Sequence, residues 1–118
     1  MADLTLWHNP QCSKSRQAKQ LLDDRGAAYV ERRYLDDAPS EAEIEQTLAA
    51  LGLEPWDITR MGEDLAKELG LKDIAKDRAT WVGILAANPR LIERPIVITA
   101  DGRAAVGRPT DAIERLLD

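Results

Sequence analysis

The sequence predicts an α/β fold, built on a four-stranded mixed sheet with helices on its faces. Residues 4–34 hold an apolar stretch, a segment with helical spacing and a second extended segment, the pattern of a parallel βαβ unit. A helical middle region follows, and the last third holds two extended segments around a tight turn before a final helical segment. The order βαβ, helical insertion, ββα is most economically satisfied by that sheet.

The first strand is expected over residues 4–7, because this apolar stretch ends at the turn His8-Asn9-Pro10. A helix is expected over residues 13–25, with Gly26 placed as its C-terminal cap. A second strand, parallel to the first, is expected over residues 28–34. Three apolar residues share one face of the helix and should point into the core: Ala18, Leu21 and Leu22.

The middle of the chain is expected to hold three helices. Ser40 and Glu43 form a capping-box pattern before the first helix, which Gly52 ends. The apolar residues of the other two are Met61, Leu65 and Leu69 before Gly70, and Trp81, Ile84 and Leu85 before Pro89. We therefore expect one 118-residue domain, with a core at about residues 3–35 and 90–118 and a helical insertion at about 40–89.

The last third contains the clearest strand pattern, residues 95–99, followed by an Asp101-Gly102 hairpin turn and a partner strand over 103–106. Gly107-Arg108-Pro109 then turns the chain into a final helix, for which proline suits the first position. The apolar residues expected on the inner face of that helix are Ile113, Leu116 and Leu117.

Composition excludes several classes of function. A net charge of −5 and a pI near 4.9 argue against a general nucleic-acid binder or a protein that binds anionic membranes. The sequence has no long apolar run and no signal-peptide pattern, so a cytoplasmic protein is expected. It also shows no metal-ligand spacing and no nucleotide-binding loop, so no bound metal or cofactor is expected.

The segment from His8 to Arg16 holds the only cysteine and the only histidine of the chain. Cys12 lies at a predicted strand-to-helix turn, where backbone N–H groups and the helix dipole lower a thiol pKa. Lys14, Arg16 or a protonated His8 would add to that effect. Since its neighbours are polar on both sides, we interpret Cys12 as a reactive thiolate that meets an anion, and not as a small core residue.

Two residues near this thiol have two interpretations each. His8 is either a general base or charged neighbour of the thiol, or a structural residue at the end of the first strand. Ser15 occupies the second position of a C-x-x-C pattern, where its hydroxyl can donate a hydrogen bond to the thiolate but cannot resolve a disulfide. The other interpretation of Ser15 is an ordinary serine of the first helical turn.

Three arginines are candidates for binding the anion: Arg60, Arg94 and Arg108. Arg94 and Arg108 each precede a proline at a predicted element boundary, and both would reach Cys12 if the C-terminal hairpin packs beside the first strand. Arginine suits a tetrahedral oxyanion because its planar fork bonds two oxygens together. Taken singly, each could equally form a surface salt bridge in this acidic chain.

Several segments, spaced over residues 4 to 117, resemble one known family in their order. They are His8-Asn9-Pro10, Cys12 followed by Ser15-Arg16, Arg60 ahead of Glu63-Asp64-Leu65, Glu93-Arg94-Pro95-Ile96-Val97, and Gly107-Arg108-Pro109. The sequence thereby resembles the ArsC family, the glutaredoxin-coupled arsenate reductases. That resemblance implies a thioredoxin-like fold with a helical insertion and a cis proline at Pro95.

The resemblance also implies a mechanism. The Cys12 thiolate would attack arsenate, while Arg60, Arg94 and Arg108 hold the oxyanion, with Arg16 and Lys14 near it. Glutathione, as co-substrate, would attack the adduct, arsenite would leave, and glutaredoxin would clear the mixed disulfide. A single cysteine agrees with this scheme, because a chain without a resolving thiol must borrow one.

Characterised arsenate reductases of the family carry Gly-Thr where this chain has Ser13-Lys14. Ser13 restricts the loop relative to glycine, and Lys14 adds a cation near the oxyanion.

Two other functions are compatible with parts of the pattern. An Spx-like, non-enzymatic regulator would share the fold, but Ser15 replaces the second cysteine of its redox switch. A monothiol, glutaredoxin-like reductase would use Cys12, but gives no reason for three arginines.

Overall fold

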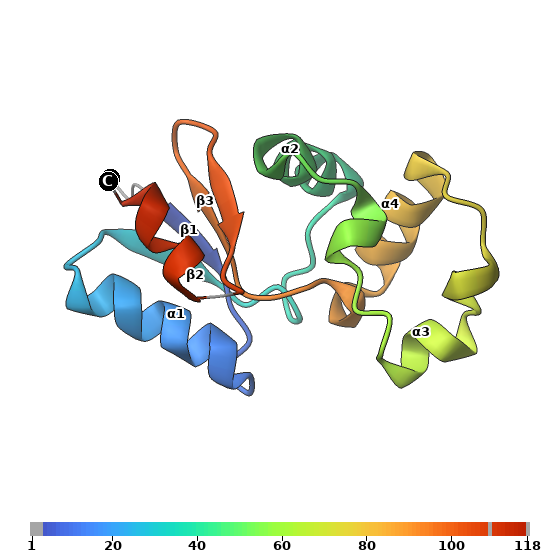
Figure 1. Ribbon diagram of the computed structural model, residues 1–118, viewed down its shortest axis with the longest axis horizontal. Coiled ribbons are helices and arrows are strands. Elements are labelled where there is room, and N and C mark those ends of the chain that lie inside the picture. Colours follow the sequence, from blue (N-terminus) through green and yellow to red (C-terminus); the bar gives the residue numbers. More distant parts are fainter. Residues whose placement is uncertain (1–3, 109, 118) are drawn as a thin grey trace. The chain divides into compact units, whose positions relative to one another are not determined.

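The computed structural model describes residues 4–108 and 110–117, and these form two compact units. The sheet unit comprises the chain up to Asp37 and from Arg94 onward, and the helical unit comprises Ala38–Glu93. Figure 1 shows the elements of each unit. The boundaries of the sheet unit lie at Asp37 and Arg94, close to the expected positions at about residues 35 and 90.

The sheet unit contains a four-stranded mixed sheet with the order β2-β1-β3-β4. Its strands are β1 (Leu4–Trp7), β2 (Tyr29–Arg32), β3 (Ile96–Thr99) and β4 (Ala104–Val106). Strand β1 pairs in parallel with β2 and antiparallel with β3, and β3 pairs antiparallel with β4. The predicted fold class is therefore confirmed, including the packing of the C-terminal hairpin beside the first strand.

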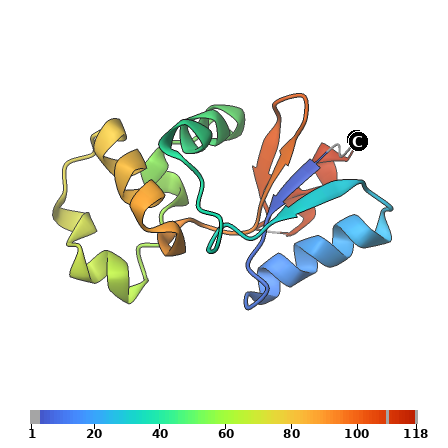
Figure 2. The same cartoon turned by 180° about the vertical axis from the view of Figure 1, so that it is seen from behind.

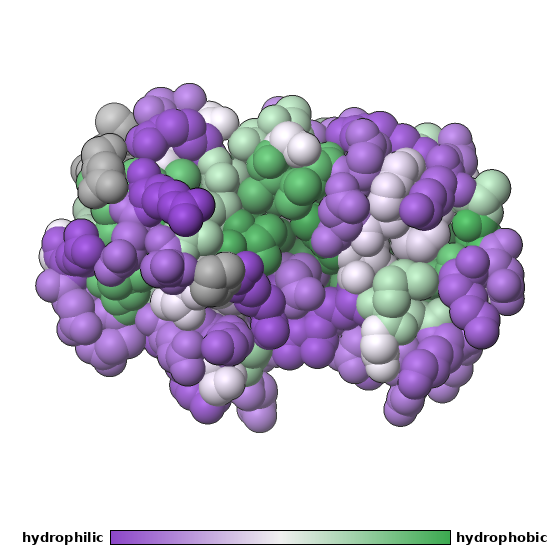
Figure 3. Space-filling model, in the orientation of Figure 1, coloured by the Kyte–Doolittle hydropathy of each residue, from purple (hydrophilic) through white to green (hydrophobic). Residues whose placement is uncertain are grey.

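Helix α1 (Ser13–Asp24) and the C-terminal segment cover the same face of this sheet (Figure 2). The register Leu6↔Val97 places alternate residues of β1 and β3 on that face. The buried core residues there are Leu4, Leu6, Ala18, Leu22, Val97 and Ile113. The outer side of α1 carries charged and amide side chains, and it belongs to the hydrophilic surface seen in Figure 3.

The helical unit contains α2 (Glu41–Leu51), α3 (Asp64–Glu68) and α4 (Arg78–Ala87), with short 3₁₀ turns between them. The predicted capping box is present, since Ser40 and Glu43 each bond the other's backbone N–H, and Gly52 ends α2 with φ +69°. Helix α2 packs on α4. Within the described ranges no helix is both long enough and apolar enough to cross a membrane.

One expected helix is present but short, and the expectation of another was wrong. Helix α3 has only five residues and ends before Gly70; its buried residue is Ala66, whereas Met61 and Leu69 are exposed. A helix this short has barely one turn, so the apolar spacing around it does not define a face. The final helix is replaced by two 3₁₀ turns, Thr110–Ala112 and Glu114–Leu116.

The C-terminal apolar residues nevertheless face the core as expected. Ile113 is fully buried, and Leu116 and Leu117 pack against the core cluster to which Ile113 belongs. The expected role of Pro109 falls outside the described residues. The second strand is shorter than expected, since it ends at Arg32. Tyr34, beyond it, turns back to stack on Trp7 at a ring separation of 6.5 Å.

A candidate thiolate site at the start of helix α1

Cys12 lies between the end of β1 and the first turn of α1, where it is the N-cap residue. Its backbone is extended (φ −98°, ψ 125°), and its carbonyl accepts the N–H of Arg16 at 3.0 Å. Its own N–H donates to the carbonyl of Asn9 at 3.0 Å. The residue is 8% exposed, so Cys12 lies largely enclosed at the N-terminus of a 12-residue helix.

The loop before Cys12 is tied to the helix by side-chain hydrogen bonds. The N–H of Asn9 donates to Oγ of Ser15 at 3.0 Å, and the Ser15 side chain is fully buried. The guanidinium of Arg16 donates to the carbonyl of Pro10 at 2.9 Å. Arg16 thus holds the loop, and Lys14 lies exposed on the same turn.

The net effect of the surroundings is to lower the Cys12 pKa below its ordinary value. Burial of the thiol is the largest influence and by itself raises the pKa. Hydrogen bonds from the backbone N–H groups of Ser15 and Lys14 outweigh it together with the charge and a hydrogen bond of Arg94. The site therefore favours a thiolate, as the position of Cys12 at a helix start predicted.

Arg108 is a second guanidinium beside the sulfur. Its Nη2 donates to Sγ of Cys12 at 3.7 Å, and its Nε donates to the carbonyl of Arg94 at 2.7 Å. Arg94 precedes a cis peptide bond to Pro95. The structure thus brings Cys12 together with Arg94 and Arg108, which lie more than 80 positions further along the chain. This arrangement can stabilise a thiolate and the oxygens of an anion that approaches it.

His8 lies at the end of β1, where its backbone extends the strand pairing, and a part for its side chain as a general base stays a prediction. It is 2% exposed, and its backbone N–H donates to the carbonyl of Arg32 at 2.8 Å, which continues the pairing of β1 with β2. Burial is the main cause that lowers the pKa of its imidazole, opposed by the nearby charge of Glu31. Nδ1 is buried without a hydrogen-bond partner among the described residues. A neutral imidazole is therefore favoured, and it does not supply positive charge to the thiol.

Arg60 belongs to the helical unit, where its side chain forms an ion pair with Glu63. Its backbone N–H donates to the carbonyl of Leu91 at 2.7 Å. These contacts stabilise the turn between the 3₁₀ segment Pro55–Ile58 and α3. A part for Arg60 in binding an anion stays a prediction.

Two residues in this region have roles that sequence reasoning did not assign. Asn9 accepts the N–H of Gln11 through Oδ1 at 3.0 Å and so shapes the loop before Cys12. Gly107 lies against Pro95, and its N–H donates to the Pro95 carbonyl at 2.8 Å. The Asn-Pro and Gly-Arg-Pro sequences predicted a turn at each of these two residues, but they did not predict the hydrogen bond of Asn9 or the packing of Gly107 on Pro95.

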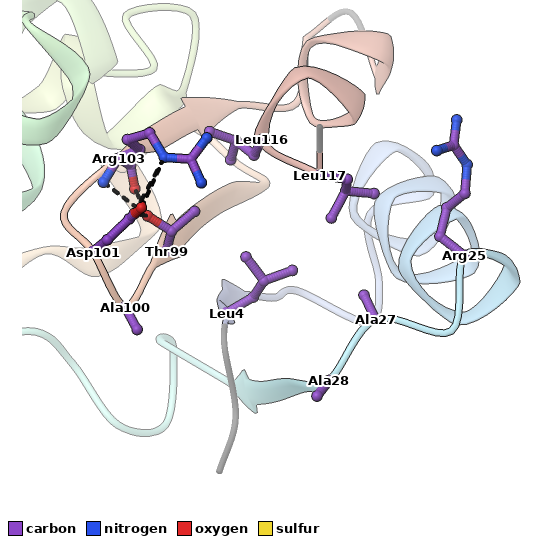
Figure 4. A pocket seen from close by; sticks show the side chains of 10 residues that line it. All are labelled: Leu4, Arg25, Ala27, Ala28, Thr99, Ala100, Asp101, Arg103, Leu116 and Leu117. Atoms are coloured by element: carbon purple, nitrogen blue, oxygen red, sulfur yellow. Dashed lines mark hydrogen bonds and ion pairs between the residues drawn. The ribbon is translucent and has the colours of Figure 1, made fainter.

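A cavity of about 520 Å³ opens elsewhere in the sheet unit, by the first residue of β1 and the β3–β4 turn (Figure 4). Its lining combines apolar side chains such as Leu4 with charged ones, and includes none of the predicted site residues. The charges there are already paired: Arg103 with Asp101, and Arg25 with Glu114. The cavity is therefore separate from the thiol.

The fold and this site together define a class: a thioredoxin-like protein with one cysteine at the start of its first helix. The sequence model of the ArsC family matches residues 7–116. The chain belongs to the ArsC family.

Three relatives illustrate the similarity. An uncharacterized protein in the glnII region of Streptomyces viridochromogenes is 55% identical over 97% of this chain and 98% of its own length. An arsenate reductase of Neisseria meningitidis serogroup A is 43% identical over 99% of this chain and 100% of its own. The solved structure of an arsenate reductase from Vibrio cholerae superimposes with a TM-score of 0.89 at 38% identity, covering 97% of this chain and 98% of that one.

Proposed function

We propose that this protein reduces arsenate to arsenite, with the Cys12 thiolate as nucleophile and glutathione and glutaredoxin as the source of electrons. The observation that carries the proposal is the Cys12 sulfur at the start of α1, with a lowered pKa and with Arg94 and Arg108 beside it. The relatives named arsenate reductases, which this chain covers over nearly their whole length, support the choice of oxyanion.

In the first step, Sγ of Cys12 attacks arsenic. A sulfur–arsenic bond forms, one arsenic–oxygen bond breaks, and the departing oxygen leaves as water after it is protonated. Arg94 and Arg108 neutralise the charge on the remaining oxygens as the anion approaches a thiolate. Without them, two negatively charged groups would have to meet, which Coulomb repulsion opposes.

In the second step, the glutathione thiolate attacks Sγ of the adduct. A disulfide forms between glutathione and Cys12, and the electron pair of the sulfur–arsenic bond stays on arsenic. Arsenic is thereby reduced from As(V) to As(III) and leaves as arsenite, while the two thiols are oxidised. Because the chain has no second cysteine, glutaredoxin must take the glutathione from Cys12 to restore the thiol.

The test is a coupled assay with NADPH, glutathione reductase, glutaredoxin and glutathione, in which NADPH consumption is followed after arsenate is added. The wild type should turn over, Cys12→Ser should be inactive, and Arg94→Ala should be strongly impaired. Arg115→Ala, a change to an exposed arginine of the sheet unit, is the matched control and should keep wild-type activity. Arg60→Ala tests the remaining prediction from sequence, a loss of activity. A wild type without arsenate-dependent turnover would refute the proposal.

The same assay distinguishes arsenate reduction from a glutaredoxin-like activity when arsenate is replaced by a glutathionylated protein. An enzyme specific for an oxyanion should show little turnover with the glutathionylated protein. Turnover that survives Arg94→Ala unchanged would instead identify a general thiol reductase, because that reaction has no oxyanion for the arginine to bind.

A further inference from the structure

We propose that Gly107 is a positioning residue, which sets the approach of Arg94 and Arg108 to the sulfur of Cys12. The proposal deepens the proposed function, and it rests on the thiolate role of Cys12. Both arginines arrive at the loop around Cys12 from the other end of the chain. Their placement is decided where β3 begins and β4 ends.

Pro95 and Gly107 face each other at that point. The last strand pair is Ile96↔Val106, and the N–H of Gly107 donates to the carbonyl of Pro95 at 2.8 Å one step further. Arg94 directly precedes Pro95, and Arg108 directly follows Gly107. The separation of the two backbones at Pro95 and Gly107 therefore sets the separation of the two arginines.

No side chain fits at position 107. A Cβ there would lie 2.7 Å from Cγ of Pro95 and 2.7 Å from Cδ1 of Ile113, much closer than carbon atoms approach. Ile113 is fully buried in the core, so it cannot simply turn away. Gly107 is also absent from the glycines with positive φ, which are Gly26, Gly52, Gly70 and Gly102. Close packing, and not backbone conformation, is the reason for glycine here.

The spacing of the two backbones at Gly107 affects the sulfur of Cys12 through two contacts. Nε of Arg108 donates to the carbonyl of Arg94 at 2.7 Å, and Nη2 of the same guanidinium donates to Sγ of Cys12 at 3.7 Å. The carbonyl thus aligns the guanidinium on the thiol. A side chain at position 107 would push the two backbones apart, lengthen the first contact and withdraw the charge from the sulfur.

The test is the pH dependence of Cys12 alkylation by iodoacetamide, which reports the thiol pKa and needs no arsenate. In Gly107→Ala the midpoint should rise by about half a pH unit, because the Arg108 charge is withdrawn from the sulfur but not removed. Gly26→Ala is the matched control: it is the same change in the same unit, it strains the backbone at φ +64°, and its Cβ meets nothing within 4 Å. It should lower thermal stability and leave the midpoint at the wild-type value.

A rescue variant separates positioning from general damage. Ile113→Val removes Cδ1, so Gly107→Ala/Ile113→Val should recover part of the shift, while Ile113→Val alone should leave the midpoint unchanged. The proposal is overturned if folded Gly107→Ala keeps the wild-type midpoint. It is also overturned if both variants that carry alanine at 107 fail to fold, since Gly107 would then serve the fold alone. A shifted midpoint in a protein that does not reduce arsenate would refute only the proposed substrate.

Discussion

Replacing Arg108 by alanine should raise the Cys12 pKa by an amount that the geometry defines. The Arg108 Nη2 lies 3.7 Å from the sulfur, and Arg108 is exposed, so the dielectric constant of water is the appropriate one. Two unit charges at that distance then interact by about 1 kcal/mol. This free energy corresponds to a rise of about 0.8 in pKa. At pH values well below both midpoints, the fraction of Cys12 present as thiolate should fall about sixfold.

The assay is the rate of iodoacetamide alkylation against pH for wild type, Arg108→Ala and the control Arg115→Ala. The wild-type midpoint should lie below the value of about 8.5 for a free thiol. Arg108→Ala should move it upward, and Arg115→Ala should not. High salt should reduce the difference between wild type and Arg108→Ala, because an exposed charge pair is screened. If Arg108→Ala keeps the wild-type midpoint at low salt, the contact does not stabilise the thiolate and the reasoning fails.

Three further predictions concern pH dependence and stability. Because burial lowers the pKa of His8, the unfolded chain binds its proton more readily, so thermal stability should fall as pH drops below 6.5, and His8→Asn should flatten that dependence. An unchanged slope would show that His8 titrates normally. Ser40→Ala removes the capping box of α2 and should lower the free energy of unfolding by about 1 kcal/mol in urea titrations, against at most about 0.5 kcal/mol for exposed Ala42→Ser. Leu22→Ala, at a fully buried position, should cost about 2–5 kcal/mol, and a smaller loss would mean that the core closes around the gap.

Local elements of the fold were predictable because local patterns cause them. The β1–α1–β2 unit follows from an apolar stretch, a helical spacing and Gly26 at the end of α1, and the β3–β4 hairpin follows from Asp101-Gly102. The C-terminal segment was predicted as a helix and forms 3₁₀ turns instead. Spacing alone identified the inward residue, Ile113, but it does not distinguish an α-helix from successive turns.

For the candidate site, the sequence by itself determined the chemistry of the parts. It placed one thiol at a helix start, where the N–H groups of the first turn are free to bond the sulfur, and it offered arginines at the strand boundaries. Tertiary structure decided which of these arginines lie beside the thiol. Arg94 and Arg108 reach Cys12 because β3 pairs with β1 and β4 with β3, and that pairing spans most of the chain.

Tertiary structure also decided the charge of His8 and the reason for Gly107. Sequence placed His8 four residues from the thiol, but only its burial in the folded chain shows that the neutral imidazole is favoured. Gly107 looked like one residue of a turn, and only its contacts with Pro95 and Ile113 show that packing requires glycine. Both depend on atoms distant in sequence, whereas local patterns report only on the conformation of their own segment.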